Sequence, residues 1–466
     1  MPISPARVAA FEILLRVDQE DAFASELLHS SAYQKLSVPD HRLATELVMG
    51  VLRWRSLLDE QIANHSSLKF GKLDPEVLTA LRLATYQLMF SDRIPARAAI
   101  HESAELVKRA RKRSAVPFAN ALLRKLANSK PHVTAIAKSQ KGSDLARSSA
   151  HPQWLVERWI QEFGIDVTRQ ICDYDQRVPE TSLIIRDLAV AEELEKHAIK
   201  LAPGHLLASS RRLVAGNLAR IPAPLRDQIA IQDEGSLLVA LLVGAGSHIL
   251  DCCAAPGGKT RALAERNPSA TVIAVELHPH RARLLRKLVA AQNVWLVVAD
   301  ARALPTATAF DRVLADVPCS GTGTLARNPE IKWRLKPEDL CDLPDLQLAI
   351  LLSAMQQVAP GGRIVYSTCS LEKEENVEVI ERALSADSSF RLLDCGERLQ
   401  QLRAEGELVW KNVGSLTRGP YLRTTPGVHP CDGFFAAILE NIHSPRRHGH
   451  TEKVRHGVAS IGLTAL

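Results

Sequence analysis

With 466 residues, the chain is long enough for two or three domains that each bury a core. Charged residues make up 24% and hydrophobic residues 46% of the sequence, as in ordinary globular proteins, and no apolar run reaches the about 18 residues of a transmembrane helix. The first residues lack the layout of a signal peptide, so we expect a cytoplasmic protein without a membrane partner. Eight cysteines without a Cys-x-x-Cys pair indicate reduced thiols and exclude a disulfide framework.

The net charge of +6 is concentrated in the first third of the chain. Residues 1–150 contain 22 Lys and Arg against 15 Asp and Glu, which gives +7, and the other residues contain 36 against 37, which gives −1. Such a basic region suits contacts with RNA phosphates, although a solvated helix end has the same composition. The densest basic cluster consists of Lys108, Arg109, Arg111, Lys112 and Arg113.

Residues 1–135 are predicted to form an all-α bundle of five to seven helices. Leu43, Leu47 and Val51 recur at helical spacing, and other apolar sets in this region do the same. Asp74-Pro75 is typical of a helix start, in which a capping residue precedes a proline in the first turn. No run with the alternation of a strand competes with this interpretation.

The composition changes twice further along the chain. The residues between 128 and 150 are polar and poor in large apolar groups, which predicts a linker. A small α+β domain is expected over 150–230, because a helical stretch there precedes the strand-like run Ser182–Arg186. The basic tail, 441–466, is predicted to be disordered.

Between 231 and 440, short apolar runs alternate with helical patterns, which predicts an α/β Rossmann-like domain with a mostly parallel sheet. Ligands of such sheets bind beyond the carboxyl ends of the strands, and three motifs of the chain directly follow such ends. The predicted strands are His248–Leu250, Ala270–Val275, Trp295–Val298, Phe310–Ala315 and Arg363–Tyr366.

The first motif is a turn of small residues after the strand at 248–250. It contains two glycines, which let a ligand approach the backbone closely. Its end, Gly258-Lys259-Thr260, also matches a phosphate loop, but Cys253 replaces the first glycine that such a loop requires. Glu276 ends the next strand, where an acidic side chain is suitably placed for ribose hydroxyls. The turn consists of Cys253, Ala254, Ala255, Pro256, Gly257, Gly258 and Lys259.

The second and third motifs place cysteines at two later strand ends. Cys319 lies in Asp316-Val317-Pro318-Cys319, and Cys369 follows Thr368 after the run at 363–366. A thiolate adds readily to an electron-poor carbon, and a second thiol nearby can act as acid or base when the adduct breaks down. A lone cysteine is more often a small buried hydrophobe. We interpret Cys252 in that way, and no metal is expected at Cys172, Cys341, Cys395 or Cys431, whose spacing fits no metal site.

These motifs, their order and the surrounding sequence resemble the RNA 5-methylcytosine methyltransferases, in particular the RsmB (Sun) type that acts on small-subunit (16S) ribosomal RNA. The resemblance covers nearly the whole chain and includes an N-terminal region similar to the helical, RNA-binding NusB fold. Shorter matches are Gln232–Ser236, Arg327–Trp333 and Asp432–Phe435, in which Asn328 and Glu330 depart from the family's His and Asp.

The resemblance implies roles for individual residues. S-adenosylmethionine would be held by residues 253–259, with Glu276 at the ribose, Asp300 at the adenine and Asp316 lining the same pocket. Cys369 would be the nucleophile that attacks C6 of cytosine, and Cys319 would assist breakdown of the adduct. Asp316 would also hydrogen-bond the Watson–Crick edge of the base, and the Lys259 cation would favour the Cys369 thiolate.

The implied function is methylation of C5 of a specific cytosine in 16S ribosomal RNA by a monomer that uses S-adenosylmethionine. The target cytosine is expected to be unpaired, because an unpaired base leaves its stack at lower cost. Three alternatives remain open. They are the same chemistry on transfer RNA, a non-catalytic RNA-binding or antitermination factor that works through the N-terminal bundle, and a nucleotide phosphatase that uses the incomplete phosphate loop.

Overall fold

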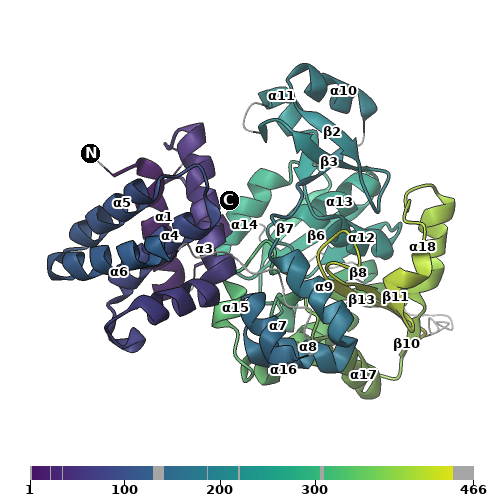
Figure 1. The fold of residues 1–466 in the computed structure, drawn as a ribbon. Coiled ribbons are helices and arrows are strands. Elements are labelled where there is room, and N and C mark those ends of the chain that lie inside the picture. The colour runs from purple at the N-terminus through teal and green to yellow at the C-terminus, as the bar shows by residue number, and fades with distance from the viewer. Residues whose placement is uncertain are drawn as a thin grey trace, which may run out of the picture.

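The computed structural model of the protein describes residues 3–20, 22–33, 35–129, 141–185, 187–218, 221–304 and 309–443. In the view of Figure 1, a helical bundle, a small sheet and a large sheet with helices on both faces follow one another along the chain. The predicted fold class, an all-α bundle followed by an α+β segment and an α/β Rossmann-like domain, is therefore confirmed. No helix of the described residues is both long enough and apolar enough to cross a membrane.

The N-terminal bundle is built around the 28-residue helix α3. The Ser37 hydroxyl accepts a hydrogen bond from the Asp40 amide at 3.2 Å and caps this helix, and a proline occupies its first turn. Helix α4 begins at Pro75 as predicted, but the Asp74 carboxylate makes no capping bond and instead pairs with Lys112. The described helices of the bundle are α1 (Pro5–Gln19), α2 (Ala24–Leu28), α3 (Val38–His65), α4 (Pro75–Phe90), α5 (Ala96–Arg109) and α6 (Val116–Asn128).

A short helix occupies part of the segment that the composition predicted as a linker. Helix α7 (Gly142–Ser148) buries Leu145 and Ala146 against helices α8 (Gln153–Phe163) and α9 (Ile165–Asp175). Only these two apolar residues of the helix are buried, so the polar composition of the segment did not reveal it. The rest of the predicted linker, residues 130–140, lies outside the described residues.

The small sheet is antiparallel, and its strand order is β2-β3-β1-β4. Helices α10 (Leu188–Lys196) and α11 (Ala223–Arg226) flank it at the top of Figure 1. Its small apolar core includes Leu183, Leu194 and Ile199. The strands are β1 (Ser182–Ile185), β2 (Lys200–Pro203), β3 (Ser210–Ala215) and β4 (Ile229–Ile231).

The large sheet combines parallel and antiparallel strands. Strands β9, β8, β5, β6 and β7 are parallel neighbours in that order, and every one of them contains a run predicted from the sequence. Strand β13 pairs antiparallel with β9, and β12 and β10 pair with β13. The strands are β5 (His248–Asp251), β6 (Thr271–Glu276), β7 (Val294–Val298), β8 (Phe310–Asp316), β9 (Val358–Thr368), β10 (Phe390–Leu393), β11 (Thr417–Arg418), β12 (Tyr421–Thr424) and β13 (Phe434–Asn441).

Two apolar layers of helices cover the two faces of this sheet. One layer packs helix α12 (Glu234–Val243) with α13 (Gly258–Arg266) and α18 (Cys395–Ala404), and the other packs α16 (Asp339–Met355) with α17 (Val377–Ala386). Helix α14 (Pro279–Leu288) covers the edge next to β7. Because β5, β6, β8 and β9 are parallel, their carboxyl ends meet at one edge, where the three motifs lie.

The helical bundle docks on the segment that follows the Pro-Cys motif. The Arg53 guanidinium donates to the Ala326 carbonyl at 2.9 Å, and the Trp333 indole donates to the Leu52 carbonyl at 2.6 Å. Glu330, one of the departures from the family pattern, accepts a hydrogen bond from the Ala24 amide at 2.8 Å. Most of the basic tail, residues 444–466, lies outside the described residues, while β13 extends to Asn441.

Candidate active site

The glycine turn after β5 forms the floor of the site. Gly257 has φ +115° and is the N-cap of α13, and a Cβ added there would lie 2.6 Å from the Val289 side chain. The Ala254 amide donates to the Val275 carbonyl at 2.9 Å, and Arg281 donates to the Ala255 carbonyl at 3.2 Å. Only glycine fits at this bend, because a Cβ would overlap the Val289 side chain and the positive φ is unfavourable for other residues.

Acidic side chains stand at three neighbouring strand ends. Glu276 is buried at the end of β6, and one of its carboxylate oxygens accepts a hydrogen bond from the His278 amide at 2.9 Å. Asp251, at the end of β5, is a residue that the motifs did not single out. It accepts a hydrogen bond from Thr260 at 2.7 Å, its Oδ1 atom has no partner among the described residues, and burial raises its pKa to about 7.

Asp300, the third of these acids, follows β7 and differs from the other two. Its carboxylate is partly exposed and pairs with Arg302 at 2.6 Å, and the hydrogen bonds from Arg302 lower its pKa. The structure thus places Asp300 at the predicted strand end, where its carboxylate is paired with the Arg302 guanidinium. Its contact with adenine remains a prediction.

The two cysteines that the motifs singled out meet in space. The Sγ atoms of Cys319, after β8, and Cys369, after β9, are 3.3 Å apart, and both side chains are half-buried. The hydrogen bond to Cys369 and burial raise the pKa of Cys319 well above its usual value. Cys319 therefore keeps its proton at neutral pH and can donate it as a hydrogen bond to Cys369.

A lysine and an aspartate lie beside the thiols. Lys259 Nζ is 2.8 Å from Asp316 Oδ2, and Ser367 donates to Asp316 Oδ1 at 2.6 Å. Burial lowers the pKa of Lys259, but the charge and hydrogen bond of Asp316, together with Cys369, outweigh it and raise that pKa. Lys259 is thus a cation, held 5.1 Å from the centre of the Phe434 ring.

The shorter motifs form a buried network beneath this site. Arg327 donates to Asp432 at 2.8 Å and to Asp233 at 3.1 Å, which joins three motifs that are far apart in the sequence. Burial raises the pKa of Asp432 to about 7, and the like charge of Asp233 adds to this effect. Among the described residues, no group of three or more His, Cys, Asp and Glu side chains is arranged to hold a metal ion.

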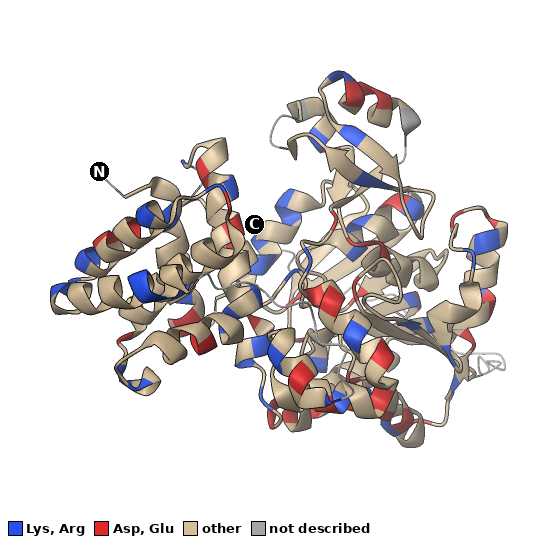
Figure 2. Cartoon of the chain, viewed as in Figure 1, with Lys and Arg blue, Asp and Glu red and all other residues tan. Residues whose placement is uncertain are grey.

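The basic cluster of the helical bundle does not lie at this site. Helices α5 and α6, which flank the cluster, are on the far side of the bundle from the large sheet (Figure 1). Lys108 pairs with Glu105 at 2.6 Å and Arg109 with Glu12 at 3.0 Å, and acidic residues alternate with basic ones on this part of the bundle (Figure 2).

A Rossmann-like sheet with a glycine turn and acids at successive strand ends is typical of proteins that bind a nucleotide-type ligand. The NusB family model matches residues 4–128, and the model described as 16S rRNA methyltransferase RsmB/F matches residues 239–440. A Bacillus subtilis (strain 168) protein named "Probable ribosomal RNA small subunit methyltransferase B" is 32% identical over 94% of this chain and 99% of that protein. The chain belongs to the 16S rRNA methyltransferase RsmB/F family and is an RNA methyltransferase.

Solved structures agree with this fold. The crystal structure of PH0851 has a TM-score of 0.76 and 24% identity, and covers 94% of this chain and 99% of that one. NSun6 from Pyrococcus horikoshii, solved with SFG, has a TM-score of 0.54 and 18% identity over 64% of this chain and all of that one. Both likenesses support the fold, and the first also includes the helical bundle.

Proposed function

We propose that the chain transfers a methyl group from S-adenosylmethionine to C5 of a specific unpaired cytosine in 16S ribosomal RNA, through a covalent bond between Cys369 and C6. The observation that carries this proposal is the distance of 3.3 Å between Cys319 and Cys369 beside the Lys259–Asp316 pair. The choice of ribosomal RNA rests on the family and on the name of the Bacillus subtilis relative. Such an enzyme would work in the cytoplasm, as expected.

The residues around the glycine turn fit S-adenosylmethionine. The Glu276 carboxylate uses one oxygen for a backbone amide, which leaves the other for ribose hydroxyls. Asp251 presents a buried oxygen without a partner, and the bend at Gly257 excludes a Cβ. SFG, an analogue of S-adenosylmethionine, is bound by the structural relative NSun6, which supports this choice. The cofactor supplies an electrophilic methyl group on its sulfonium.

Cytosine C5 is a poor nucleophile, and the thiol of Cys369 overcomes this. As a thiolate, Cys369 adds to C6, and the electron pair of the C5–C6 double bond becomes available at C5 for the methyl group. The Lys259 cation favours the thiolate, and the Asp316 carboxylate, which pairs with Lys259, accepts a hydrogen bond from the N4 amino group of the base. Each Asp316 oxygen has room for a second hydrogen bond besides those from Lys259 and Ser367.

Release of the product requires that C5 lose its proton and that the C6–S bond break. Cys319 can serve both tasks, because its thiol lies next to the sulfur of Cys369 and becomes a base once it has given its proton to that sulfur. It gives that proton to the sulfur of Cys369 and takes the proton from C5, while the C5–C6 double bond forms again. Both thiols then carry a proton, and the one on Cys369 is lost before the next turnover.

The helical bundle and the basic cluster are proposed to position the RNA. The domain boundaries 1–135, 150–230 and 231–440 and the monomeric state also remain predictions.

Bisulfite sequencing tests the proposal directly. The purified chain is incubated with S-adenosylmethionine and 16S ribosomal RNA, with transfer RNA as the alternative substrate. One cytosine of the 16S RNA should become resistant to deamination, and only with the cofactor present. Methylation of transfer RNA alone would move the proposal to that substrate. Binding of ATP in place of S-adenosylmethionine would instead support the phosphatase alternative and end the proposal.

A further inference from the structure

A buried carboxylate connects the two cysteine loops, and the mechanism above does not use it. Glu375 lies at the end of the short helix η6 (Lys373–Glu375), six residues after Cys369, and its exposed fraction is 0%. A carboxylate removed from water is costly unless hydrogen bonds compensate its charge. The partners of Glu375 therefore indicate what its burial achieves.

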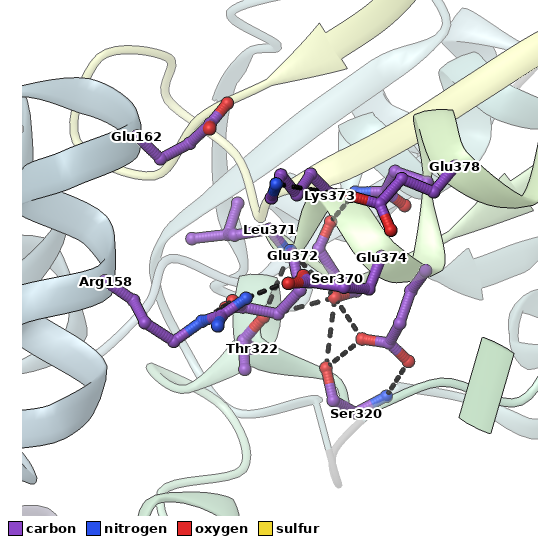
Figure 3. A network of polar contacts seen from close by, with 12 residues as sticks. Arg158, Glu162, Ser320, Thr322, Ser370, Leu371, Glu372, Lys373, Glu374 and Glu378 are labelled. Atoms are coloured by element: carbon purple, nitrogen blue, oxygen red, sulfur yellow. Dashed lines mark hydrogen bonds and ion pairs between the residues drawn. The ribbon is translucent and has the colours of Figure 1, made fainter. Parts of the chain in front are cut away.

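Both oxygens of Glu375 are bound by the residue that follows Cys319. Oε1 accepts a hydrogen bond from the Ser320 amide at 2.8 Å, and Oε2 accepts one from the Ser320 hydroxyl at 2.5 Å. Oε2 also accepts a hydrogen bond from the hydroxyl of Ser370, the residue that follows Cys369. One carboxylate thus holds the residues next to both thiols, and Figure 3 shows Ser320 and Ser370 joined through this network.

A second set of contacts extends the bridge to the backbone. Gln347, fully buried on α16, donates to Glu375 Oε1 at 2.8 Å and to the Pro318 carbonyl at 3.0 Å. The Tyr366 hydroxyl donates to the Glu375 carbonyl at 2.6 Å. Residues on both sides of Cys319 are therefore tied to the Glu375 carboxylate, and the backbone carbonyl of Glu375 is tied to strand β9, which leads to Cys369.

We propose that Glu375 is a positioning residue that sets the distance between the Cys319 and Cys369 thiols through Ser320 and Ser370. The two loops come from different strands, and the direct contacts between them include an amide–carbonyl bond from Gly323 to Cys369 and a contact of 3.0 Å between the Ser320 and Ser370 hydroxyls. The four hydrogen bonds to Glu375 add a rigid, charge-assisted link next to both sulfur atoms. Its catalytic consequence rests on the proposed function, whereas its effect on thiol distance does not.

The variant Glu375→Gln separates the effect of the hydrogen bonds of Glu375 from the effect of its negative charge. In Glu375→Gln, the amide nitrogen can take the place of Oε2, where both serine hydroxyls can rotate to accept its two protons. The position of Oε1 faces two N–H donors, the Ser320 amide and the Gln347 side chain, so only the oxygen of the new amide fits there. This variant should keep the link, whereas Glu375→Ala removes it. Ser370→Ala removes the arm to the Cys369 loop together with the contacts of this hydroxyl with Ser320, Thr322 and the Glu372 amide.

Disulfide formation measures the thiol distance without RNA or cofactor. The full-length protein is treated with a diazenedicarboxamide oxidant, which takes the two thiol hydrogens as a new Cys319–Cys369 bond forms, and the bond is identified by peptide mapping. We expect the wild type and Glu375→Gln to react at similar rates and Glu375→Ala to react more slowly, on the order of tenfold. Ser370→Ala should be intermediate.

Glu372→Gln is the matched control. Glu372 is also a buried carboxylate of the same loop, but its side chain binds Arg158 at 2.8 Å and the Trp159 indole at 3.1 Å, not the serine hydroxyls (Figure 3). Its substitution should leave the rate of disulfide formation unchanged. If Glu375→Ala does not fold, the comparison of Ser370→Ala with Glu372→Gln carries the same test.

The catalytic consequence is measured separately. In Glu375→Ala, kcat for RNA methylation should fall by about 10²-fold with the affinity for S-adenosylmethionine unchanged, and Glu375→Gln should restore most of it. Equal rates of disulfide formation in the wild type and Glu375→Ala, or no such disulfide in the wild type, would overturn the inference. If the wild type does not methylate RNA at all, the proposed function fails, while the disulfide comparison still decides the role of Glu375.

Discussion

At the residue scale, the two thiols have the same chemistry but different surroundings. Cys369 lies near the Lys259 cation, and Cys319 has a pKa raised by its hydrogen bond to Cys369 and by burial. A nucleophile needs the first environment, and a proton donor needs the second. The position of Cys369 near the Lys259 cation agrees with the role of nucleophile that the family resemblance implies.

Substitution of Cys369 by alanine should abolish methylation, because no other group supplies electron density at C5. We expect the rate to fall by about 10⁴-fold or more, with the affinity for S-adenosylmethionine nearly unchanged, since the thiol contacts the base and not the methyl donor. Transfer of labelled methyl groups to RNA and calorimetric titration with the cofactor measure the two quantities. Substantial turnover by this variant would remove Cys369 from the role of nucleophile.

Substitution of Cys319 by alanine should have a different result. The adduct between Cys369 and C6 can still form, but it lacks the group that resolves it, so enzyme and RNA should remain covalently joined. A band of enzyme bound to RNA on a denaturing gel detects this species. The double variant that also lacks Cys369 is the control and should show no band. If the band comes instead from the Cys369 variant, the two roles must be exchanged.

The residues found from the sequence differ in kind from those that the sequence did not reveal. Cys319, Cys369 and Lys259 belong to motifs whose order along parallel strands predicts that they meet. The role of Glu375 depends on which hydroxyls its carboxylate reaches after folding, and nothing in periodicity or spacing indicates that. Asp251 did not stand out because an acid at the end of a strand is common, and only its burial makes it unusual.

At the scale of elements, substitution of Gly257 tests whether the cofactor binds at the glycine turn. Gly257→Ala would place a Cβ 2.6 Å from Val289 at φ +115°, so the turn must move. Gly244→Ala is the matched control, because Gly244 also has a positive φ, +77°, but the nearest atom to its Cβ is 4.0 Å away. Both variants should lose about 1–3 kcal/mol of stability through backbone strain, because both glycines have backbone conformations that other residues rarely adopt.

The two glycine variants should differ in cofactor binding. Only Gly257→Ala should weaken the binding of S-adenosylmethionine, because only there does the backbone of the turn move. Thermal unfolding and calorimetric titration measure stability and affinity. Equal cofactor affinities in both variants would contradict a pocket on this turn.

Elements whose pattern lies within a short stretch of sequence were predicted, and elements that depend on contacts with distant residues were not. The parallel strands are apolar runs and were found in the sequence, as was the helical bundle with its 3.6-residue period. Strands β10 to β13 were not predicted, because their order depends on pairing with β9 from far along the chain. Helix α7 was hidden in a polar segment, since only two of its residues are buried.

At the scale of the whole molecule, the bundle and the catalytic domain share a polar interface. The Lys332 ammonium is buried and donates to the Arg53 carbonyl at 2.8 Å and the Ala150 carbonyl at 3.0 Å. Burial lowers its pKa, and the nearby Asp175 charge opposes that effect. This contact lies thirteen residues after Cys319, so removal of the whole bundle would disturb the catalytic domain as well as any RNA contact.

Neutralising single charges is therefore a cleaner test of RNA docking than deleting the bundle. Arg111 and Arg113 make no ion pair with the described residues, whereas Lys112 holds Asp74 at 3.2 Å. If these two arginines bind RNA phosphates, Arg111→Gln with Arg113→Gln should weaken RNA binding. The log–log salt dependence should become shallower by about 0.9 for each phosphate of a duplex that is no longer bound, or about 0.7 for each phosphate of a single strand.

The control removes the same charge from another part of the molecule. Arg382→Gln with Arg391→Gln changes α17 and β10, which lie on the opposite side from the bundle in Figure 1. Filter binding of 16S RNA over a range of salt concentrations gives both slopes, and the affinity for S-adenosylmethionine should not change in either variant. A slope as steep in the bundle variant as in the control would show that Arg111 and Arg113 bind no phosphates. The role of the bundle would then lie in its contacts with the segment after Cys319.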